Sequence, residues 1–331
     1  MGMGKFIIRR ILAAIPVLLL TTFVAFVLIR SIPGGPFSQT SAGRRLPERI
    51  VERLEQQYGL NQPVLIQFGN YLLSLIRLDF GPALGTQYRD EDVSVNQVIA
   101  MRLPVSIQVG IMSVIVGFAI GVPLGVLAAI YHNSAIDFGA TFFAVLGQSI
   151  PALVLAPVLI IIFAVKLNWL PVADMGGVWR STLENPSVIF SWDYLSLAIL
   201  PVFALGTGMS AGIARLTRAS LLQVMREDYI RTARAKGLKE RVVIYGHALK
   251  NALIPVATIV GPLLAGVLTG TFIIERIFNI PGLGREFVQC VGSRDYNLLV
   301  GLTVVYSVFL VSGNILVDIM YTWLDPRIRF D

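Results

Sequence analysis

Six stretches of this 331-residue chain contain no Asp, Glu, Lys or Arg and come close to, or exceed, the roughly 20 residues that a helix needs to cross a bilayer. Hydrophobic residues make up 55% of the chain and charged residues 14%, which is too apolar for a soluble core inside a charged shell. We therefore predict an all-α membrane protein with about six transmembrane helices in one membrane domain. The stretches are 11–29, 103–136, 138–165, 194–214, 251–274 and 296–317.

Lysine and arginine counts predict the orientation, because cytoplasmic loops accumulate these residues. The tail before the first stretch has three basic residues and no acidic one, and segment 215–250 has nine basic against three acidic residues. Segments 31–102 and 275–295 are balanced, with seven and three residues of each sign. We expect both termini and 215–250 to be cytoplasmic, and the two balanced segments to face outward. The same placement accounts for the net charge of +7 without nucleic acid as a partner.

The first stretch is expected to be a retained helix. Its 19 uncharged residues exceed the apolar region of a typical signal peptide, and Arg30-Ser31-Ile32-Pro33-Gly34 lacks a small-x-small cleavage site. The predicted parts of the chain are therefore a tail with the first helix (1–30), an extracytoplasmic loop (31–102), a five-helix core (103–317) and a C-terminal tail (318–331).

The extracytoplasmic loop is too long for a simple connection and carries helical signals of its own. Pro47 suits the first position of a helix that Gly59 ends, and Pro63 starts a second helix that ends near Arg77 and Asp79. Two interpretations stay open. The helices are a lid that packs only on the spans, or they are a docking surface for an external binding protein.

Small residues and prolines mark the predicted spans. Glycines at four-residue spacing, which let helix backbones approach closely, predict helix packing at Gly117, Gly121 and Gly125, and again at Gly208 and Gly212. Prolines are expected to interrupt two spans, since each lacks a backbone donor. They are Pro151 and Pro157 in the third span, and Pro255 and Pro262 in the fifth.

No interior position of a predicted span is charged, which disfavours a proton- or ion-coupled carrier. A polar path or gate has five candidates, and the polar ones among them also suit hydrogen bonds between helices. They are Gln108, Gln148, Ser149, Pro151 and Asn314.

Catalytic and metal motifs are missing from the sequence. It has no G-x-x-x-x-G-K-[ST] phosphate loop, and His132 and His247 fit no metal-ligand spacing. The single cysteine, Cys290, is interpreted as a small packing residue. We therefore expect no catalytic residue, no metal site and no cofactor bound by this chain.

The basic segment 215–250 contains a predicted short helix at about 227–236. Acidic residues at its start and basic residues at its end complement the helix dipole, and Gly237 follows as a C-terminal cap. The small side chains of Ala233 and Ala235 would let another protein approach the helix backbone closely. This favours a docking element, although a solvated basic loop that only fixes the topology has the same composition.

The stretch from Glu227 to Leu238, followed by His247 to Pro255, resembles the cytoplasmic signature of bacterial ABC importer permeases of the dipeptide/oligopeptide/nickel branch. Aligned on Gly237, the chain keeps Ala233, Gly237 and Leu249 of the general signature E-A-A, three residues, G, nine residues, I-x-L-P. Arg231 stands in place of the acid and Lys250 in place of the proline. Further similarity lies at Phe6–Arg10, Tyr58–Pro63, Leu78–Gly81, Ile277–Gly284 and Tyr321–Arg327.

This resemblance implies a type I ABC importer permease fold in the bacterial plasma (inner) membrane. It implies that the signature forms a coupling helix on separate ATP-binding subunits, which hold ATP and magnesium. The implied partners are a second homologous permease, two ATP-binding subunits or domains, and an extracytoplasmic substrate-binding protein; a homodimer stays open. The implied coupling residues are Glu227, Asp228, Tyr229, Ala233, Ala235, Gly237 and Leu238.

The expected cargo is a di- or oligopeptide, while relatives of this kind also handle nickel, glutathione or sugars. Two hypotheses of other classes stay open: a secondary carrier or channel that works without an ATPase, and a scaffold with no transport role. A channel should conduct alone in liposomes, whereas a permease should be inert without its ATPase.

Overall fold

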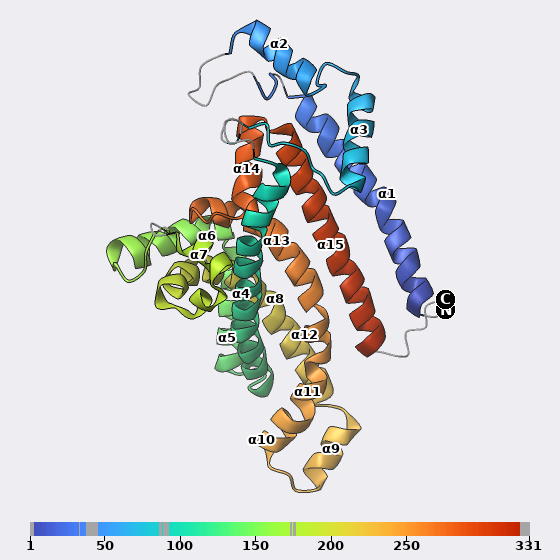
Figure 1. Ribbon diagram of the computed structural model, residues 1–331. Coiled ribbons are helices and arrows are strands. Elements are labelled where there is room, and N and C mark those ends of the chain that lie inside the picture. Colours follow the sequence, from blue (N-terminus) through green and yellow to red (C-terminus); the bar gives the residue numbers. More distant parts are fainter. Residues whose placement is uncertain are drawn as a thin grey trace. The chain divides into compact units, whose positions relative to one another are not determined.

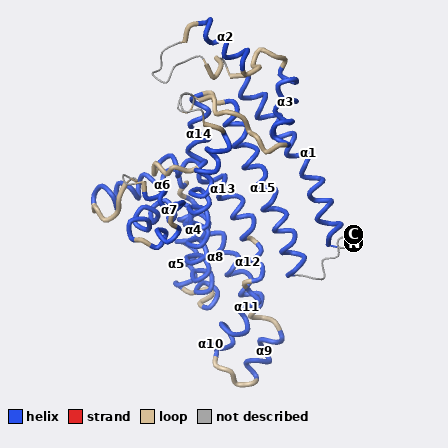
Figure 2. Tube along the Cα trace, in the orientation of Figure 1, coloured by secondary structure: helices blue, strands red, loops and turns tan. Residues whose placement is uncertain are grey.

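The computed structural model describes residues 3–32, 34–37, 46–85, 88, 93–172, 174 and 177–324, and these residues are mostly helical (Figures 1 and 2). The described residues form no strand beyond a single bridge between Pro82 and Ser94. The chain divides into two compact units. We call residues 107–280, with the chain end from residue 312, the central unit, and residues 2–106 with 281–311 the N-terminal unit.

Four single helices among the described residues are long and apolar enough to cross a bilayer. They include Ile7–Arg30 of α1 (Met3–Arg30), all of α4 (Val95–Ile130) and α8 (Trp192–Val224), and Tyr296–Leu316 of α15 (Tyr296–Leu324). A fifth candidate span is the bent pair Ala135–Ser149 and Ala152–Lys166. The predicted all-α membrane class is therefore confirmed, with a helix count roughly consistent with the prediction.

The predicted span 251–274 consists of several short helices. They are α11 (Leu249–Ala252), α12 (Ile254–Thr258) and α13 (Val260–Ile277). Pro255 and Pro262 fall in the first turns of α12 and α13, where a missing backbone donor leaves no intrahelical hydrogen bond unmade. These prolines therefore interrupt the segment as predicted.

The third predicted span bends at Pro151. Helix α5 (Ala135–Ser149) and helix α6 (Ala152–Leu159) with its π-helical continuation η2 (Ile160–Lys166) meet at 98°. Pro151 precedes α6 in an extended conformation, and Pro157 lies within α6, three residues before the π-helical turn. Helices α7 (Val178–Glu184) and η3 (Pro186–Phe190), which the sequence analysis did not identify, follow this span.

The turn between α4 and α5 lies at residues 131–134, just before Asp137, which alone separates the uncharged stretches 103–136 and 138–165. Asp137 lies inside the first turn of α5. The actual N-cap is Ser134, whose hydroxyl accepts from the backbone N–H groups of Ile136 and Asp137. A hydroxyl at this position satisfies amides that the first turn of a helix leaves unpaired, which is why the helix begins here.

Three glycines of α4 lie against α8 within the central unit, as predicted. A Cβ at Gly121 would lie 2.6 Å from the Ser210 carbonyl oxygen, and one at Gly125 would lie 2.5 Å from that of Ala214. Only glycine fits contacts this short. The prediction for Gly208 and Gly212 was wrong within this chain, because no described atom lies within 4 Å of a Cβ added at either residue.

The N-terminal unit contains the two short helices expected in the long loop, α2 (Glu48–Gln57) and α3 (Val64–Ile76). Pro47 and Pro63 precede these helices as N-caps, so the expected first helical position of Pro47 was off by one residue. Gly59 has the left-handed backbone that a terminating glycine provides, with φ +66°. The unit also contains α14 (Leu283–Ser293), where Cys290 is fully buried, as expected of a packing residue.

Candidate functional site

The predicted docking helix is α9 (Asp228–Ala235), and it follows α8 after a turn of three residues. Glu227 is the N-cap residue, with φ −68° and ψ 148°, and its backbone N–H donates to the Val224 carbonyl at 3.1 Å. Asp228 lies in the first turn and Arg234 in the last, which complements the helix dipole. The structure therefore contains the short helix expected at about 227–236.

One face of α9 packs against the chain's own core. Ile230 is fully buried and Ala233 is 8% exposed. Both belong to an apolar cluster whose other fully buried members lie in α8 and in the segment after α9, among them Leu221, Val243 and Ala252. The expectation that the small side chain of Ala233 would admit another protein is therefore wrong, since this position faces inward.

The opposite face of α9 is exposed. The Asp228 side chain is 95% exposed and that of Arg231 is 72% exposed, and the two form an ion pair at 3.3 Å. Tyr229 is exposed along its ring, while its hydroxyl accepts from the Asn251 side-chain amide at 2.7 Å. Ala235 is exposed as expected. A ligand of this surface would meet the aromatic ring and charges of both signs.

The C-terminal end of α9 is fixed by a glycine cap and an ion pair. Gly237 has φ +77°, and the backbone N–H of Leu238 donates to the Ala233 carbonyl at 3.4 Å. Arg234 binds both carboxylate oxygens of Glu240, with Nη2–Oε1 at 2.6 Å and Nε–Oε2 at 3.2 Å. The hydrogen bonds of this pair, reinforced by its opposite charges, lower the pKa of Glu240 and raise that of Arg234.

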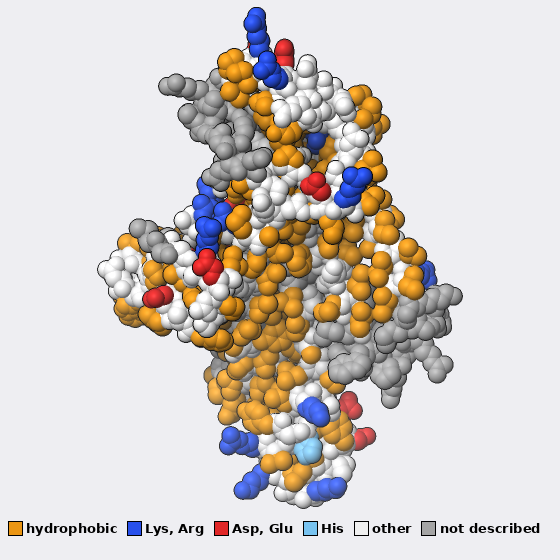
Figure 3. Space-filling model, in the orientation of Figure 1, with side chains coloured by type: hydrophobic (Ala, Val, Ile, Leu, Met, Phe, Trp, Pro, Cys, Tyr) orange, Lys and Arg blue, Asp and Glu red, His pale blue; other side chains and the backbone are white. Residues whose placement is uncertain are grey.

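An open hollow of about 480 Å³ lies at the N-terminal end of α9. It is lined by the last turns of α8, by Arg226 and by both acidic residues at the helix start, Glu227 and Asp228. Charged side chains gather at the end of the central unit that carries α9 and α10 (Glu240–Val242), whereas the adjoining surface of the unit is apolar (Figure 3). A polar partner therefore finds a recess next to the predicted coupling residues.

No hydrogen bond given for the described residues joins any two of the five candidate pathway residues. Gln108 is engaged between helices of the central unit, since its side-chain amide donates to Thr182 at 3.0 Å and accepts from the Tyr194 hydroxyl at 3.0 Å. Ser149 donates to a carbonyl of its own helix at 2.8 Å. Gln148, Pro151 and Asn314 are exposed. Gln108 thus forms interhelical hydrogen bonds, and the pathway role of all five residues stays a prediction.

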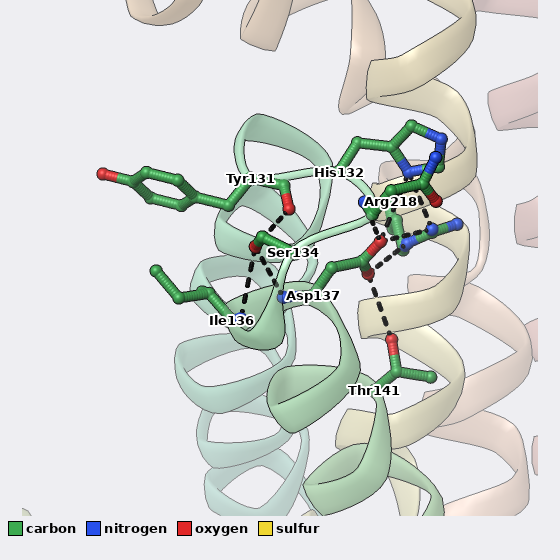
Figure 4. A network of polar contacts seen from close by, with 8 residues as sticks. Tyr131, His132, Ser134, Ile136, Asp137, Thr141 and Arg218 are labelled. Carbon is green, nitrogen blue, oxygen red and sulfur yellow. Dashed lines mark hydrogen bonds and ion pairs between the residues drawn. The ribbon is translucent and has the colours of Figure 1, made fainter.

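A buried ion pair lies at the α4–α5 hairpin, and the sequence analysis did not identify it (Figure 4). Asp137 is 3% exposed, and its carboxylate accepts from Arg218 of α8, with Nε–Oδ1 at 2.8 Å and Nη2–Oδ2 at 2.7 Å. The backbone N–H of Asn133 and the Thr141 hydroxyl also donate to it, at 3.0 and 3.4 Å. Asp137 is the only acid between two long uncharged stretches, and this isolation was the signal available in the sequence.

Groups of histidine, cysteine and acidic residues that suit a metal ion do not occur in the described part of the chain. The site has an exposed face with charges of both signs beside an open recess.

Comparison with known proteins decides the family. Residues 121–330 match the binding-protein-dependent transport system inner membrane component family, and residues 3–110 match the N-terminal region of the same kind of membrane component. The chain belongs to this family. Membership makes it a multi-pass inner-membrane protein, as the membrane-spanning helices also indicate.

Individual relatives cover the whole length of this permease-family chain. It is 41% identical over 327 residues to the dipeptide transport system permease protein DppB of Bacillus subtilis, covering 99% of this chain and 98% of the relative. It is 39% identical over 328 residues to the oligopeptide transport system permease protein OppB of Salmonella typhimurium, covering 99% and 100%. The resemblance to the dipeptide/oligopeptide branch is confirmed.

Solved structures support the fold. An amino acid ABC transporter with histidines matches with a TM-score of 0.50 and 16% identity, covering 68% of this chain and 92% of that one. The MetNI methionine ABC transporter in inward-facing conformations matches with a TM-score of 0.50 and 17% identity, covering 67% and 96%. At these identities the likeness shows the fold alone, and the fold is that of an ABC transporter membrane subunit.

Proposed function

We propose that this chain is the permease subunit of an ATP-binding-cassette importer and that its cargo is a di- or oligopeptide. The observation that carries the proposal is the similarity to dipeptide and oligopeptide permeases over 99% of the chain. The chain itself catalyses no covalent chemistry, and ATP and magnesium bind to partner subunits. Both termini face the cytoplasm, in keeping with the basic residues of the tail and of segment 215–250.

The proposed assembly contains a second, homologous permease, two ATP-binding subunits or domains, and an extracytoplasmic binding protein that delivers the peptide. Helix α9 is the element that contacts an ATP-binding subunit. Its inner face is anchored through Ile230 and Ala233, so the contact is made by the exposed residues Asp228, Tyr229 and Leu238. Because α9 is anchored to α8 and to the segment after it, a force on α9 reaches the spans.

ATP binding then favours one conformation of the spans and hydrolysis resets it. The two subunits are coupled only to the extent that the ATPase binds the two conformations with different free energies. Gly237 matters because it closes α9 in a left-handed conformation that other residues adopt at a cost of about 1 kcal/mol or more.

The test uses the complete transporter in proteoliposomes and measures ATP-driven uptake of a radiolabelled tripeptide. Gly237→Val is expected to insert normally and to lose at least 90% of uptake. The matched change Gly69→Val lies in α3, where no described atom is within 4 Å of an added Cβ, and it should keep uptake. Asp228→Lys reverses an exposed charge without straining the backbone, and we expect it to weaken ATPase binding. Normal uptake in both coupling variants would remove α9 from the mechanism.

Two experiments without substitutions test the alternative classes, a channel or carrier and a scaffold. Conduction in liposomes that contain this chain without an ATPase would establish a channel or carrier. Unchanged peptide uptake after deletion of the gene would establish a scaffold.

A further inference from the structure

Arg30, the last residue of α1, is a half-buried cation in the N-terminal unit that has no counter-charge among the residues that the structure describes. Its Nε donates to Gln67 Oε1 at 2.8 Å and its Nη1 to the Phe26 carbonyl at 3.4 Å. None of its contacts with described residues is to a carboxylate, and Nη2 makes no hydrogen bond to them. An arginine normally uses the outer edge of its guanidinium to bind a carboxylate or phosphate in a bidentate manner.

The guanidinium is held in place by neighbours that are themselves fixed. Its Cζ lies 3.4 Å from the centroid of the Phe26 ring, and Phe26 is 1% exposed. Gln67 accepts from Nε on another edge of the guanidinium. The side-chain amide of Gln67 in turn donates to the carbonyls of Leu60 and Gln62, at 3.0 and 2.7 Å, which fixes its position. Arg30 is therefore positioned before any ligand arrives, which reduces the entropy that binding would cost.

Arg30 lines a cavity of about 400 Å³ that lies wholly within the N-terminal unit. This volume is within the range of about 300–1,000 Å³ that is typical of ligand pockets. No acidic side chain is among the described residues that line it. Six side-chain amides line it instead, namely Gln56, Gln57, Gln62, Gln67, Asn70 and Asn297.

A second polar group in this cavity is the hydroxyl of Tyr71. Tyr71 is 8% exposed, and its hydroxyl is buried without a hydrogen-bond partner among the described residues. A buried hydroxyl in this state costs about 1–3 kcal/mol, so a bound acceptor would recover that free energy. Burial raises the pKa of Tyr71, which keeps the hydroxyl protonated and able to donate.

We propose that this cavity binds the C-terminal carboxylate of a short peptide, with Arg30 and Tyr71 as the residues that recognise the charged end. The inference rests on the proposed function for the cargo, and it adds a peptide-binding site in the permease subunit itself. Amide side chains suit the hydrogen-bonding groups of a peptide backbone, and the aromatic rings of Tyr58 and Phe80 in the cavity wall accept side chains of different shapes.

A lipid phosphate is the other source of an anionic oxygen group for Arg30. The six amides favour the peptide, because a lipid continues from its phosphate into acyl chains that leave amide groups without partners. The experiment separates the two sources by offering each of them to the same protein.

The probe is trialanine, added to the full-length protein in phosphatidylcholine nanodiscs and measured by saturation-transfer NMR. We expect trialanine with a free carboxylate to bind at least about tenfold more tightly than its C-terminal amide, a comparison that needs no mutation. Arg30→Gln should weaken binding by at least about tenfold and Tyr71→Phe by several-fold. The control is Arg77→Gln, because Arg77 is an exposed arginine of the same unit outside the cavity, and it should change nothing.

Three results would overturn the inference. The first two are equal binding of the acid and the amide, and no binding of either. The third is a lipid in place of the peptide: phosphatidylglycerol co-purifies with the wild type but not with Arg30→Gln, and trialanine does not bind. The proposed function is judged separately by tripeptide uptake in the complete transporter. If uptake is ATP-driven and Arg30→Gln leaves its KM unchanged, the function stands and this site falls.

Discussion

Arg218 of α8 donates to both carboxylate oxygens of Asp137, at 2.8 and 2.7 Å, and so joins α8 to the start of α5. The pair is enclosed on the Asp137 side, since the Arg218 side chain is 30% exposed and that of Asp137 only 5%. An acid in this position needs its cation, because the free energy lost on burial is recovered only by pairing and hydrogen bonds.

Removing the cation alone should therefore destabilise the protein. We expect Arg218→Met to lower the free energy of unfolding by about 3 kcal/mol, because it leaves the buried Asp137 carboxylate without its arginine, with His132 Nδ1 at 3.3 Å as the remaining side-chain nitrogen beside it. Adding Asp137→Asn to the same chain should restore most of that loss. Thermal unfolding in detergent measures both, and a double variant no more stable than Arg218→Met would show that the pair is not the source of the effect.

The close contact between α4 and α8 predicts that adding one methyl group at Gly121 lowers the stability of the protein. Gly121→Ala places a Cβ 2.6 Å from the Ser210 carbonyl and 2.7 Å from Ile213 Cβ, so the helices must separate. We expect a loss of about 1–3 kcal/mol, as for other overpacked cores. The matched change Gly208→Ala meets no described atom within 4 Å. It should leave the thermal midpoint of the isolated chain unchanged, and equal losses in the two variants would contradict the close approach.

Substitutions on the buried face of α9 should affect its stability, and substitutions on the exposed face should affect binding of the ATPase. Ile230→Ala removes a fully buried side chain, and we expect it to destabilise the local structure of α9 by about 2–4 kcal/mol. Leu238→Ala changes an exposed residue, so it should leave amide protection in α9 intact and weaken co-purification of the ATPase. Hydrogen exchange over residues 228–238 and pull-down measure the two effects. Protection lost in Leu238→Ala would argue against the assigned faces.

The Arg234–Glu240 pair predicts a dependence on pH. The folded-state pKa of Glu240 is lowered, so the pair stabilises the end of α9 above the ordinary pKa of a glutamate and is lost as the pH falls through the folded value. Glu240→Gln should reproduce the acid effect at neutral pH. Because both side chains are exposed by about half, the gain in amide exchange should be at most about fivefold. Exchange in Glu240→Gln that still rises on acidification would implicate another group.

The helices could be predicted from the sequence where the signal was local. Long uncharged stretches located the spans, and the acidic start and glycine end of α9 located its boundaries to within a residue or two. Gly59 and Gly237 have the left-handed backbone that their positions required. Spans, caps and left-handed glycines depend only on residues close in sequence, so they can be predicted without knowing the tertiary contacts.

The failures concern contacts between distant segments. Which face of α9 turns inward depends on Leu221, Val243 and Ala252, and no spacing within α9 reveals them. Asp137 is close in sequence to His132, but its main partner, Arg218, is 81 residues away. Likewise, Gly121 and Gly212 follow the same spacing rule, yet an added Cβ would meet described atoms within 4 Å only at Gly121.

Cys290 gives the protein a practical advantage. It is the only cysteine in the sequence, it is fully buried in α14, and burial raises the pKa of its thiol. The thiolate is the species that reacts with maleimides, so Cys290 is protected from labelling in the folded state. Fluorophores and spin labels attached to single cysteines introduced on α9 or around Arg30 will therefore report from the chosen position in an otherwise wild-type chain.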